Sequence, residues 1–241
     1  VSPAVRGVRP AGPSLSKPLR AELRGPLGGG RQAWSVDRDD GRSTPRALHE
    51  FAALRPAGGF SLIMADPPWR FLTYGPKGRG RSAERHYPTM TLDEIAALPV
   101  ATLAAPDCLL WLWTTNPLLP RAFEIVEAWG FEFRTAGHWA KRHPSGRLAF
   151  GTGYILRSAG EPFLIAVRGT PRTARTVRSV IDAPPREHSR KPDEAYAAAE
   201  ALMPEATRIE LFSRESRPGW TAWGLEAGKF DAPMPKEIAA E

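Results

Sequence analysis

The tetrapeptide Asp66-Pro67-Pro68-Trp69 places a carboxylate, two prolines and a large aromatic ring in direct succession. Each proline lacks a backbone N–H and stiffens the turn, so the carboxylate and the nearby carbonyls form a fixed set of hydrogen-bond acceptors. This set suits an exocyclic amino group on a flat ring, because the amino hydrogens can bond to the acceptors while the ring stacks on Trp69. The lone pair of an aryl amine is delocalised, so holding the nitrogen in line with an electrophile matters more than deprotonating it. The structural alternative is an Asp-Pro turn that ends a strand, with Trp69 in the core.

A buried strand is expected to position Asp66. Residues 60–66 form a near-continuous apolar run that ends at the Asp-Pro turn, which is typical of a parallel sheet. Further strands are predicted at residues 107–115, 132–140, 162–168 and 208–214, and helices at 91–98, 118–129 and 191–203. This alternation predicts an α/β fold, a three-layer sandwich built on a mostly parallel sheet. Ligands bind at the carboxyl ends of such strands, where Asp66 and the pair Ser213-Arg214 are expected to lie.

The composition excludes several classes of protein. The 241 residues contain no apolar stretch long enough for a membrane helix, and the Arg-dotted start lacks the apolar core of a signal peptide, so we expect a soluble cytoplasmic protein without a membrane partner. With Cys108 as the single cysteine, neither an internal disulfide nor a Cys-based zinc site can form. The histidines His138, His143 and His188 lack the spacing of zinc ligands, so no metal is expected.

Three segments are distinguished by their composition. Residues 1–46 contain six Pro, seven Gly and nine Lys or Arg against four acids, and are predicted to be a basic, largely disordered arm, either a solvated tail or a nucleic-acid tether. Residues 47–230 are the predicted folded domain, and residues 231–241 a C-terminal tail.

The formal net charge of +7 favours a polyanionic partner, and its distribution does so more strongly. Lys and Arg outnumber acids by five to one in residues 70–86, by five to none in 134–157, and by seven to two in 168–191. These segments flank the candidate site, so their arginines are predicted to follow a phosphate backbone. The candidates are Arg79, Arg81, Arg142, Arg147, Arg172, Arg175 and Arg178.

Several motifs occur together in a fixed order over residues 60–224. They are Met64-Ala-Asp-Pro-Pro-Trp69, Tyr87-Pro-Thr-Met90, Leu110-Trp-Leu-Trp113, Gly151-Thr-Gly153, Glu161, His188-Ser-Arg-Lys-Pro-Asp-Glu194, Ile209-Glu-Leu-Phe-Ser-Arg214 and Gly219-Trp220. In this order and spacing the chain resembles the DPPW-type adenine amino-methyltransferases, the family of the catalytic subunit of the messenger-RNA adenosine methyltransferase. It looks most like the bacterial or phage DNA methyltransferases of that family.

The resemblance implies a Rossmann-like enzyme that uses S-adenosylmethionine, releases S-adenosylhomocysteine and requires no metal. The catalytic segment would be Asp66, Pro67, Pro68 and Trp69, with the Asp66 carboxylate and the Pro67 carbonyl holding the target amino group and Trp69 packing against the base. The methyl group would be displaced directly from the sulfonium. A base in a duplex cannot reach such a pocket, so the target must be unpaired or flipped out.

The resemblance also implies cofactor-binding residues. Lys191 matches the lysine that meets the cofactor's carboxylate, as an ammonium can through a charge-assisted bond, and Arg214 matches an arginine near the ribose. His188, Ser213 and Glu226 complete the set. Relatives often have Gly-Asn before the Glu or Gln that contacts the ribose, whereas Leu225 stands here, which puts the cofactor affinity in question. Without the resemblance, Lys191 would be a solvated helix start and Arg214 a surface ion-pair partner.

The implied substrate contacts are Tyr87 and Glu161, which match positions that face the adenosine; Lys141, at a strand end, is a weaker candidate. Arg79 and Arg172 are predicted to bind the substrate backbone. The preferred partner is DNA, either single-stranded or duplex with base flipping, and RNA is the alternative substrate. A second alternative is a catalytically silent nucleic-acid-binding subunit, although such relatives typically lose the Asp-Pro-Pro motif, which is intact here. Family members often pair, so a homodimer or a paired subunit is a further candidate partner.

Overall fold

In the computed structural model of the chain, the described residues are 43–70, 88–153, 155–187 and 190–231, and the side chains of 43–45 are left aside. The predicted arm, the predicted C-terminal tail, Tyr87, Arg79, Arg81 and His188 lie wholly or almost wholly outside these ranges. Among the described residues, no helix is long and apolar enough to cross a membrane.

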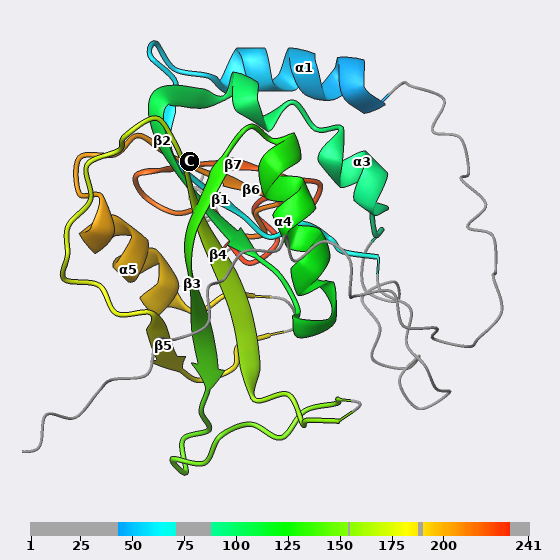
Figure 1. The fold of residues 1–241 in the computed structure, drawn as a ribbon, viewed down its shortest axis with the longest axis vertical. Helices are drawn as coiled ribbons and strands as arrows, with labels where there is room; N and C mark the ends of the chain where they lie inside the picture. The colour runs from blue at the N-terminus through cyan, green and yellow to red at the C-terminus, as the bar shows by residue number, and fades with distance from the viewer. Residues whose placement is uncertain (1–42, 71–87, 154, 188–189, 232–241) are drawn as a thin grey trace, which may run out of the picture. The chain divides into compact units, whose positions relative to one another are not determined.

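Within the described ranges, seven strands form one sheet in the order β5-β3-β4-β2-β1-β6-β7 (Figure 1). The strands are β1 (Phe60–Ala65), β2 (Ala104–Trp113), β3 (Glu132–Lys141), β4 (Gly160–Arg168), β5 (Val180–Ala183), β6 (Arg208–Leu211) and β7 (Trp220–Trp223). Only β4 runs antiparallel to its neighbours, β2 and β3, and the other four pairings are parallel. The predicted α/β fold with a mostly parallel sheet is therefore confirmed.

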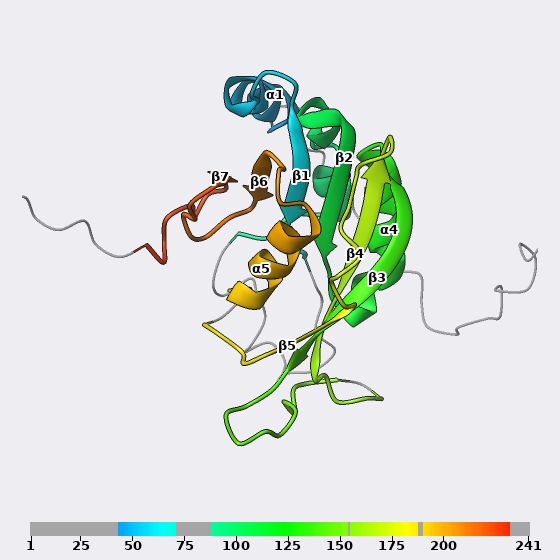
Figure 2. The same ribbon diagram turned by 90° about the vertical axis from the view of Figure 1, so that its left-hand side faces the viewer.

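Helices cover both faces of the sheet (Figure 2). They are α1 (Ser43–Leu54), α3 (Leu92–Ala96), α4 (Leu119–Ala128) and α5 (Asp193–Leu202), with short 3-10 turns at Val100–Thr102 and Asn116–Leu118. Side chains of α1, α3 and α4 share one core with Ile63 and Ala65 of β1, whereas α5 shares the other with Leu62 and Met64. Because successive side chains of β1 enter opposite cores, this strand is apolar throughout, as a central parallel strand should be.

The predicted helix at residues 91–98 begins at Thr91, whose side chain accepts a hydrogen bond from the Glu94 N–H while the Glu94 carboxylate accepts one from the Thr91 N–H. This capping box satisfies two backbone groups that the helix start would otherwise leave free. The predicted strand at 208–214 ends earlier, at Leu211, because Phe212 adopts a left-handed φ of 64°. The sequence pattern predicts neither α1 nor the four-residue strands β5 and β7 at the sheet edges.

Candidate active site

The candidate residues meet at the end of the sheet where its parallel strands finish, which we call the carboxyl edge. Asp66 directly follows β1, and Lys141 is the last residue of β3, a strand that runs in the same direction. Glu161 lies near the beginning of β4, and because β4 is antiparallel its beginning reaches that same edge. The sheet therefore assembles, from strand ends far apart in sequence, the crevice that parallel α/β sheets use for ligands.

Lys191 joins two carboxylates at this edge. Its Nζ lies 2.7 Å from Asp66 Oδ2 and 3.0 Å from Glu161 Oε2. The other oxygen of Glu161 accepts a hydrogen bond from Lys141. We call Asp66, Glu161, Lys141 and Lys191 the charge cluster; its two carboxylates and two ammonium groups balance. The Lys191 side chain is only 7% exposed, and its Nζ lies 5.3 Å from the centre of the Trp113 ring.

Burial and charge compete in setting the pKa values of the cluster. Burial opposes the charge on Glu161, but Lys191 and Lys141 outweigh it and bring the pKa of Glu161 down to about 2. Burial also opposes the charge on Lys191, but Asp66 and Glu161 raise the pKa of its ammonium well above the usual range. Burial raises the pKa of Asp66, assisted by the charge of Glu161 and opposed by Lys191. Lys191 is therefore a permanent cation, and Asp66 is the more basic carboxylate.

The two prolines hold the turn after Asp66 in a defined shape. The Trp69 N–H donates to the Pro67 carbonyl at 2.8 Å, and the Met90 N–H donates to the Pro68 carbonyl at 2.9 Å. A carbonyl oxygen has two lone pairs, so the Pro67 carbonyl can accept a second hydrogen bond from a ligand. The turn thus retains the two acceptors, carboxylate and carbonyl, that the sequence predicts for an amino group.

Trp69 has a framework role in the structure. Its side chain is 6% exposed and packs in the core with α3 and α4, and its indole N–H donates to the Trp113 carbonyl at 3.2 Å. This bond ties the turn after β1 to the end of β2. The packing of Trp69 against a base stays a prediction.

A second group of candidate residues follows β6. Arg214 Nε lies 2.8 Å from Glu226 Oε2. The Asp66 N–H donates to the carbonyl of Leu211, the last residue of β6, at 3.4 Å, so the segment after β6 begins beside the Asp66 turn. A Cβ at Gly224 would lie 2.9 Å from the backbone N and O of Ser213, so only glycine permits this approach of the two segments. Leu225 is 84% exposed, so its side chain leaves the Arg214–Glu226 pair intact.

Glu210 is a buried acid beside the site that the sequence reading did not single out. Glu210 of β6 pairs in the sheet with Met64 of β1, and Met64 lies two residues before Asp66 in the sequence. The Tyr196 hydroxyl donates to its Oε1 at 2.6 Å, and Ser213 Oγ lies 2.8 Å from its Oε2. Ser213 Oγ also lies 2.8 Å from the Glu215 carbonyl, although a hydroxyl has a single hydrogen to donate.

A protonated Glu210 satisfies every group in this network. Glu210 then donates to Ser213 Oγ, which donates in turn to the Glu215 carbonyl. Burial raises the pKa of Glu210, in agreement with a neutral acid. In the protonated form, Glu210 would fix the turn before Arg214 without adding a charge next to Asp66.

Glu210→Gln should therefore be nearly neutral, whereas Glu210→Ala should destabilise the fold by about 2–4 kcal/mol, because it removes the acceptor of the buried Tyr196 hydroxyl and one of the two partners of the Ser213 hydroxyl. The amide of glutamine reproduces both contacts of a protonated carboxyl group. Urea unfolding of the two variants measures the difference in the free energy of unfolding. Equal destabilisation by both would show that Glu210 is ionised in the folded protein.

The arginines predicted to follow a phosphate backbone have different environments. Arg172, Arg175 and Arg178 are exposed between β4 and β5. Arg142 is paired with Asp182 at 2.9 Å, and Arg147 is exposed. Among the described residues, no three His, Cys, Asp or Glu side chains are grouped so that they could hold a metal ion.

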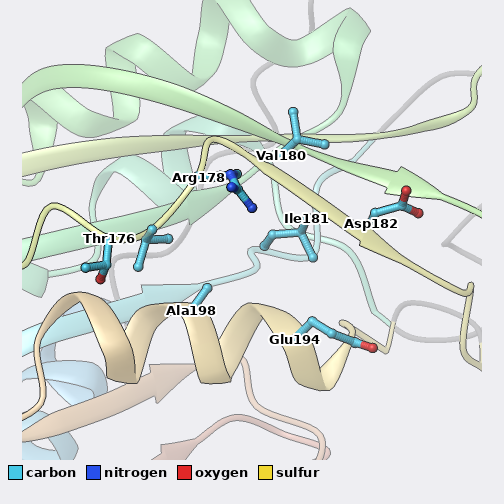
Figure 3. A pocket seen from close by; sticks show the side chains of 8 residues that line it. Thr176, Arg178, Val180, Ile181, Asp182, Glu194 and Ala198 are labelled. Atoms are coloured by element: carbon cyan, nitrogen blue, oxygen red, sulfur yellow. The ribbon is translucent and has the colours of Figure 1, made fainter.

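A shallow pocket of about 320 Å³ opens between β5 and α5 (Figure 3). Its walls are mixed in charge, because Arg178 lines it together with the acids Asp182 and Glu194. The described residues that line it include no member of the charge cluster, so the pocket is separate from the candidate site.

The structure thus brings together Asp66, Pro67, Pro68 and Trp69 with Lys141, Glu161 and Lys191, and places Ser213, Arg214 and Glu226 beside them. Besides Glu210, the residue that sequence reasoning missed is Trp113, whose ring contacts Lys191. The signal for Glu210 is visible in the sequence as a lone acid within the apolar run of β6. For Trp113 the signal is its place at the end of a buried strand beside the crevice.

The chain is similar in sequence to known proteins of one family. The chain matches the MT-A70 family over residues 60–226. It is 34% identical over 213 residues to the type II methyltransferase M.MunI of Mycoplasma sp, which covers 79% of this chain and 88% of that protein. It is 32% identical over 194 residues to the N6-methyladenosine RNA methyltransferase MTA1 of Cryphonectria parasitica, covering 76% of this chain and 55% of that protein. It is 33% identical over 173 residues to the human N(6)-adenosine-methyltransferase catalytic subunit METTL3, and the match covers 69% of this chain and 28% of that protein.

Proposed function

This chain belongs to the MT-A70 family of methyltransferases, and on that premise we propose that it methylates the exocyclic amino group of adenine in DNA with S-adenosylmethionine as the methyl donor. The observation that carries the proposal is the acceptor pair at the end of β1. The Asp66 carboxylate is fixed by Lys191 at 2.7 Å, and the Pro67 carbonyl keeps a free lone pair beside it. Together they can hold the two hydrogens of one amino group.

The described residues fit the cofactor. The ammonium of Lys191 has three protons, of which Asp66 and Glu161 take two, so one remains for the cofactor's carboxylate. Arg214 and Glu226 offer a donor and an acceptor for ribose hydroxyls, with Ser213 and His188 as the further members of the proposed set. At the end of β2, Trp113 Nε1 and Thr114 Oγ1 are buried without a hydrogen-bond partner among the described residues, so a polar ligand can satisfy them.

The proposed reaction is a direct displacement. S-adenosylmethionine supplies the methyl group, whose bond to sulfur breaks as the adenine nitrogen forms its new bond to carbon. Asp66 and the Pro67 carbonyl align the nitrogen, and alignment is a large part of what such a reaction needs. The methylated nitrogen must then lose a proton, and the Asp66 carboxylate accepts it; its raised pKa makes it the better base of the two carboxylates.

The remaining substrate residues act around this centre. Glu161 and Lys141 are proposed to line the adenine pocket, together with Tyr87. Trp69 is proposed to pack against the base, and Pro68 to stiffen the turn. Arg79 and Arg172 are proposed to contact the nucleic-acid backbone. The base must be unpaired or flipped out to enter.

DNA is the proposed substrate because the type II methyltransferase is matched over most of both chains. RNA is the second candidate, and the similarity to an N6-methyladenosine RNA methyltransferase favours it. An adenine amino group is chemically the same in either polymer, so the acceptor pair at Asp66 serves both.

Transfer of a labelled methyl group to matched single-stranded DNA, duplex DNA and RNA oligonucleotides tests the proposal. We expect transfer to DNA to exceed transfer to RNA. Faster transfer to RNA would move the assignment to the second candidate. Transfer to none of them, despite measurable binding of S-adenosylmethionine, would contradict the enzymatic function and favour a silent nucleic-acid-binding subunit.

A further inference from the structure

The loop between β3 and β4 carries an unusual concentration of exposed apolar side chains. Leu148 is 50% exposed, Phe150 77%, Ile155 84% and Leu156 83%, which makes half of the eight large hydrophobic side chains that are exposed among the described residues. Single exposed apolar residues are common, but a group of them indicates a binding surface. The loop extends from the sheet at the end opposite α1 (Figures 1 and 2).

Backbone hydrogen bonds hold this loop in shape. The Gly151 N–H donates to the Ser158 carbonyl at 2.7 Å, and the Ala149 N–H donates to the Lys141 carbonyl at 2.7 Å. The guanidinium of Arg142 adds a side-chain hydrogen bond to the Gly146 carbonyl at 2.7 Å. Leu148 and Phe150 are therefore presented by a hydrogen-bonded segment.

The loop carries positive charges and no acid of its own, and Arg142 is paired with Asp182 of β5. No acid occurs between Glu132 and Glu161 in the sequence, whereas Arg147 and Arg157 flank Phe150. The guanidinium of Arg157 lies 5.0 Å from the centre of the Phe150 ring. An exposed aromatic ring beside apolar side chains and positive charge suits a ligand that has flat rings and a negative backbone. Contact between this loop and the same loop of a second copy is disfavoured by the like charge.

The position of the loop connects it to the site. The loop begins directly after Lys141 and ends just before Glu161. Two members of the charge cluster therefore stand at its two ends. The loop is therefore anchored at the same end of the sheet as Asp66, so a strand whose target base lies at Asp66 can continue toward it.

We propose that Leu148, Phe150, Ile155 and Leu156, with Arg147 and Arg157, form a stacking surface for the unpaired bases that flank the target adenine. We call this set the loop patch. The proposal rests on the proposed function, because the strand that it binds is the substrate. It adds an apolar, base-contacting surface to the arginines that follow the backbone. Such a surface favours an unpaired strand over a duplex, since stacking requires an open base face.

Phe150→Ala tests the loop patch, with Leu48→Ala as the control because Leu48 is also exposed, at 44%, but lies on α1. Fluorescence anisotropy with a single-stranded DNA oligonucleotide should show about tenfold weaker binding for Phe150→Ala and no change for Leu48→Ala. Thermal unfolding should be unchanged in both, since neither side chain is buried.

A second substrate shows whether Phe150 contacts a base. Replacing the bases that flank the target adenine by abasic sites should weaken binding to the wild-type protein by a similar factor. The same replacement should have little effect on Phe150→Ala, because the two changes remove one contact. If the abasic sites weaken binding to Phe150→Ala by the same factor as they weaken binding to the wild-type protein, Phe150 does not stack on those bases. That result would overturn the proposal.

The remaining outcomes separate this proposal from the proposed function. Phe150→Ala that binds the oligonucleotide within twofold of the wild-type protein, while the wild-type protein transfers methyl groups, would overturn the loop patch alone. Conversion of a dimer to a monomer by Phe150→Ala, with unchanged oligonucleotide affinity, would overturn it in favour of an interface between copies. Wild-type protein that transfers no methyl group, yet binds the oligonucleotide through Phe150, would contradict the proposed function and support the loop patch.

Discussion

Replacing Asp66 by alanine should lower the rate of methyl transfer by about a thousandfold, comparable to removing a group that stabilises a transition state directly. The change removes both the acceptor that aligns the amino group and the base that takes its proton. Lys191 keeps its contact with Glu161 at 3.0 Å, so the variant does not leave the buried ammonium unpaired. Binding of S-adenosylmethionine should therefore remain within a few-fold of the wild-type value.

Two further variants sharpen this test. Asp66→Asn keeps the shape of the side chain but replaces one acceptor oxygen by an NH₂ group, which cannot accept a hydrogen bond from Lys191 or from the substrate's amino group. The variant should therefore lose nearly as much activity as Asp66→Ala. Asp182→Ala is the matched control, because Asp182 is an ion-paired carboxylate at the surface, 52% exposed, that contacts Arg142. A large loss of S-adenosylmethionine binding in Asp66→Ala would instead assign Asp66 to the cofactor.

Lys191→Met should destabilise the folded protein by about 3 kcal/mol at neutral pH, because it removes the buried cation that two partly buried carboxylates share. Methyl transfer should be lost as well, since Asp66 is no longer fixed and the cofactor's carboxylate loses its partner. Urea unfolding and S-adenosylmethionine titration measure the two effects. Lys229→Met, which removes an exposed lysine paired with Glu226, should change the free energy of unfolding by less than about 0.5 kcal/mol.

The pH dependence of the Lys191→Met effect has a definite sign. In the wild-type protein Lys191 and Lys141 together hold the pKa of Glu161 at about 2, below the ordinary value of 4.5, and the charge of Lys191 has the larger effect of the two charges. A carboxylate with a lowered pKa stabilises the fold above its unfolded pKa, and this stabilisation is lost as the pH falls from about 4.5 toward 2. The difference between wild type and Lys191→Met should therefore be largest at neutral pH and shrink below pH 4.5. A difference that grows in acid would contradict the pairing of Lys191 with Glu161.

Local patterns were sufficient to predict the central parts of the fold. The apolar run of β1 and its Asp-Pro ending locate Asp66 at the carboxyl edge, because a short apolar run that ends at a turn is typical of a strand buried on both faces. The capping residues Thr91 and Glu94 locate the start of α3 for a similarly local reason. The family motifs add the identities of Lys191, Glu161 and Arg214.

The contacts within the site depend on features that such patterns do not contain. The antiparallel direction of β4 brings Glu161 to the same edge as Asp66, and strand direction is a property of the whole sheet. The sharing of Lys191 by two carboxylates follows from that direction. The left-handed Phe212 ends β6 early, and it is a bulky residue in a conformation usually found at glycine. Strands β5 and β7 are too short to be recognised apart from the neighbours with which they pair.

The central claim, that the Asp66 turn presents adenine for methylation, is tested most directly by identifying the methylated atom. The protein is incubated with labelled S-adenosylmethionine and DNA that contains adenine, and the DNA is digested to nucleosides for chromatography and mass spectrometry. We predict that the label is found in N6-methyladenine, and that Asp66→Ala leaves the same nucleoside unlabelled. Label in another nucleoside, or N6-methyladenine formed at the wild-type rate by Asp66→Ala, would contradict this account.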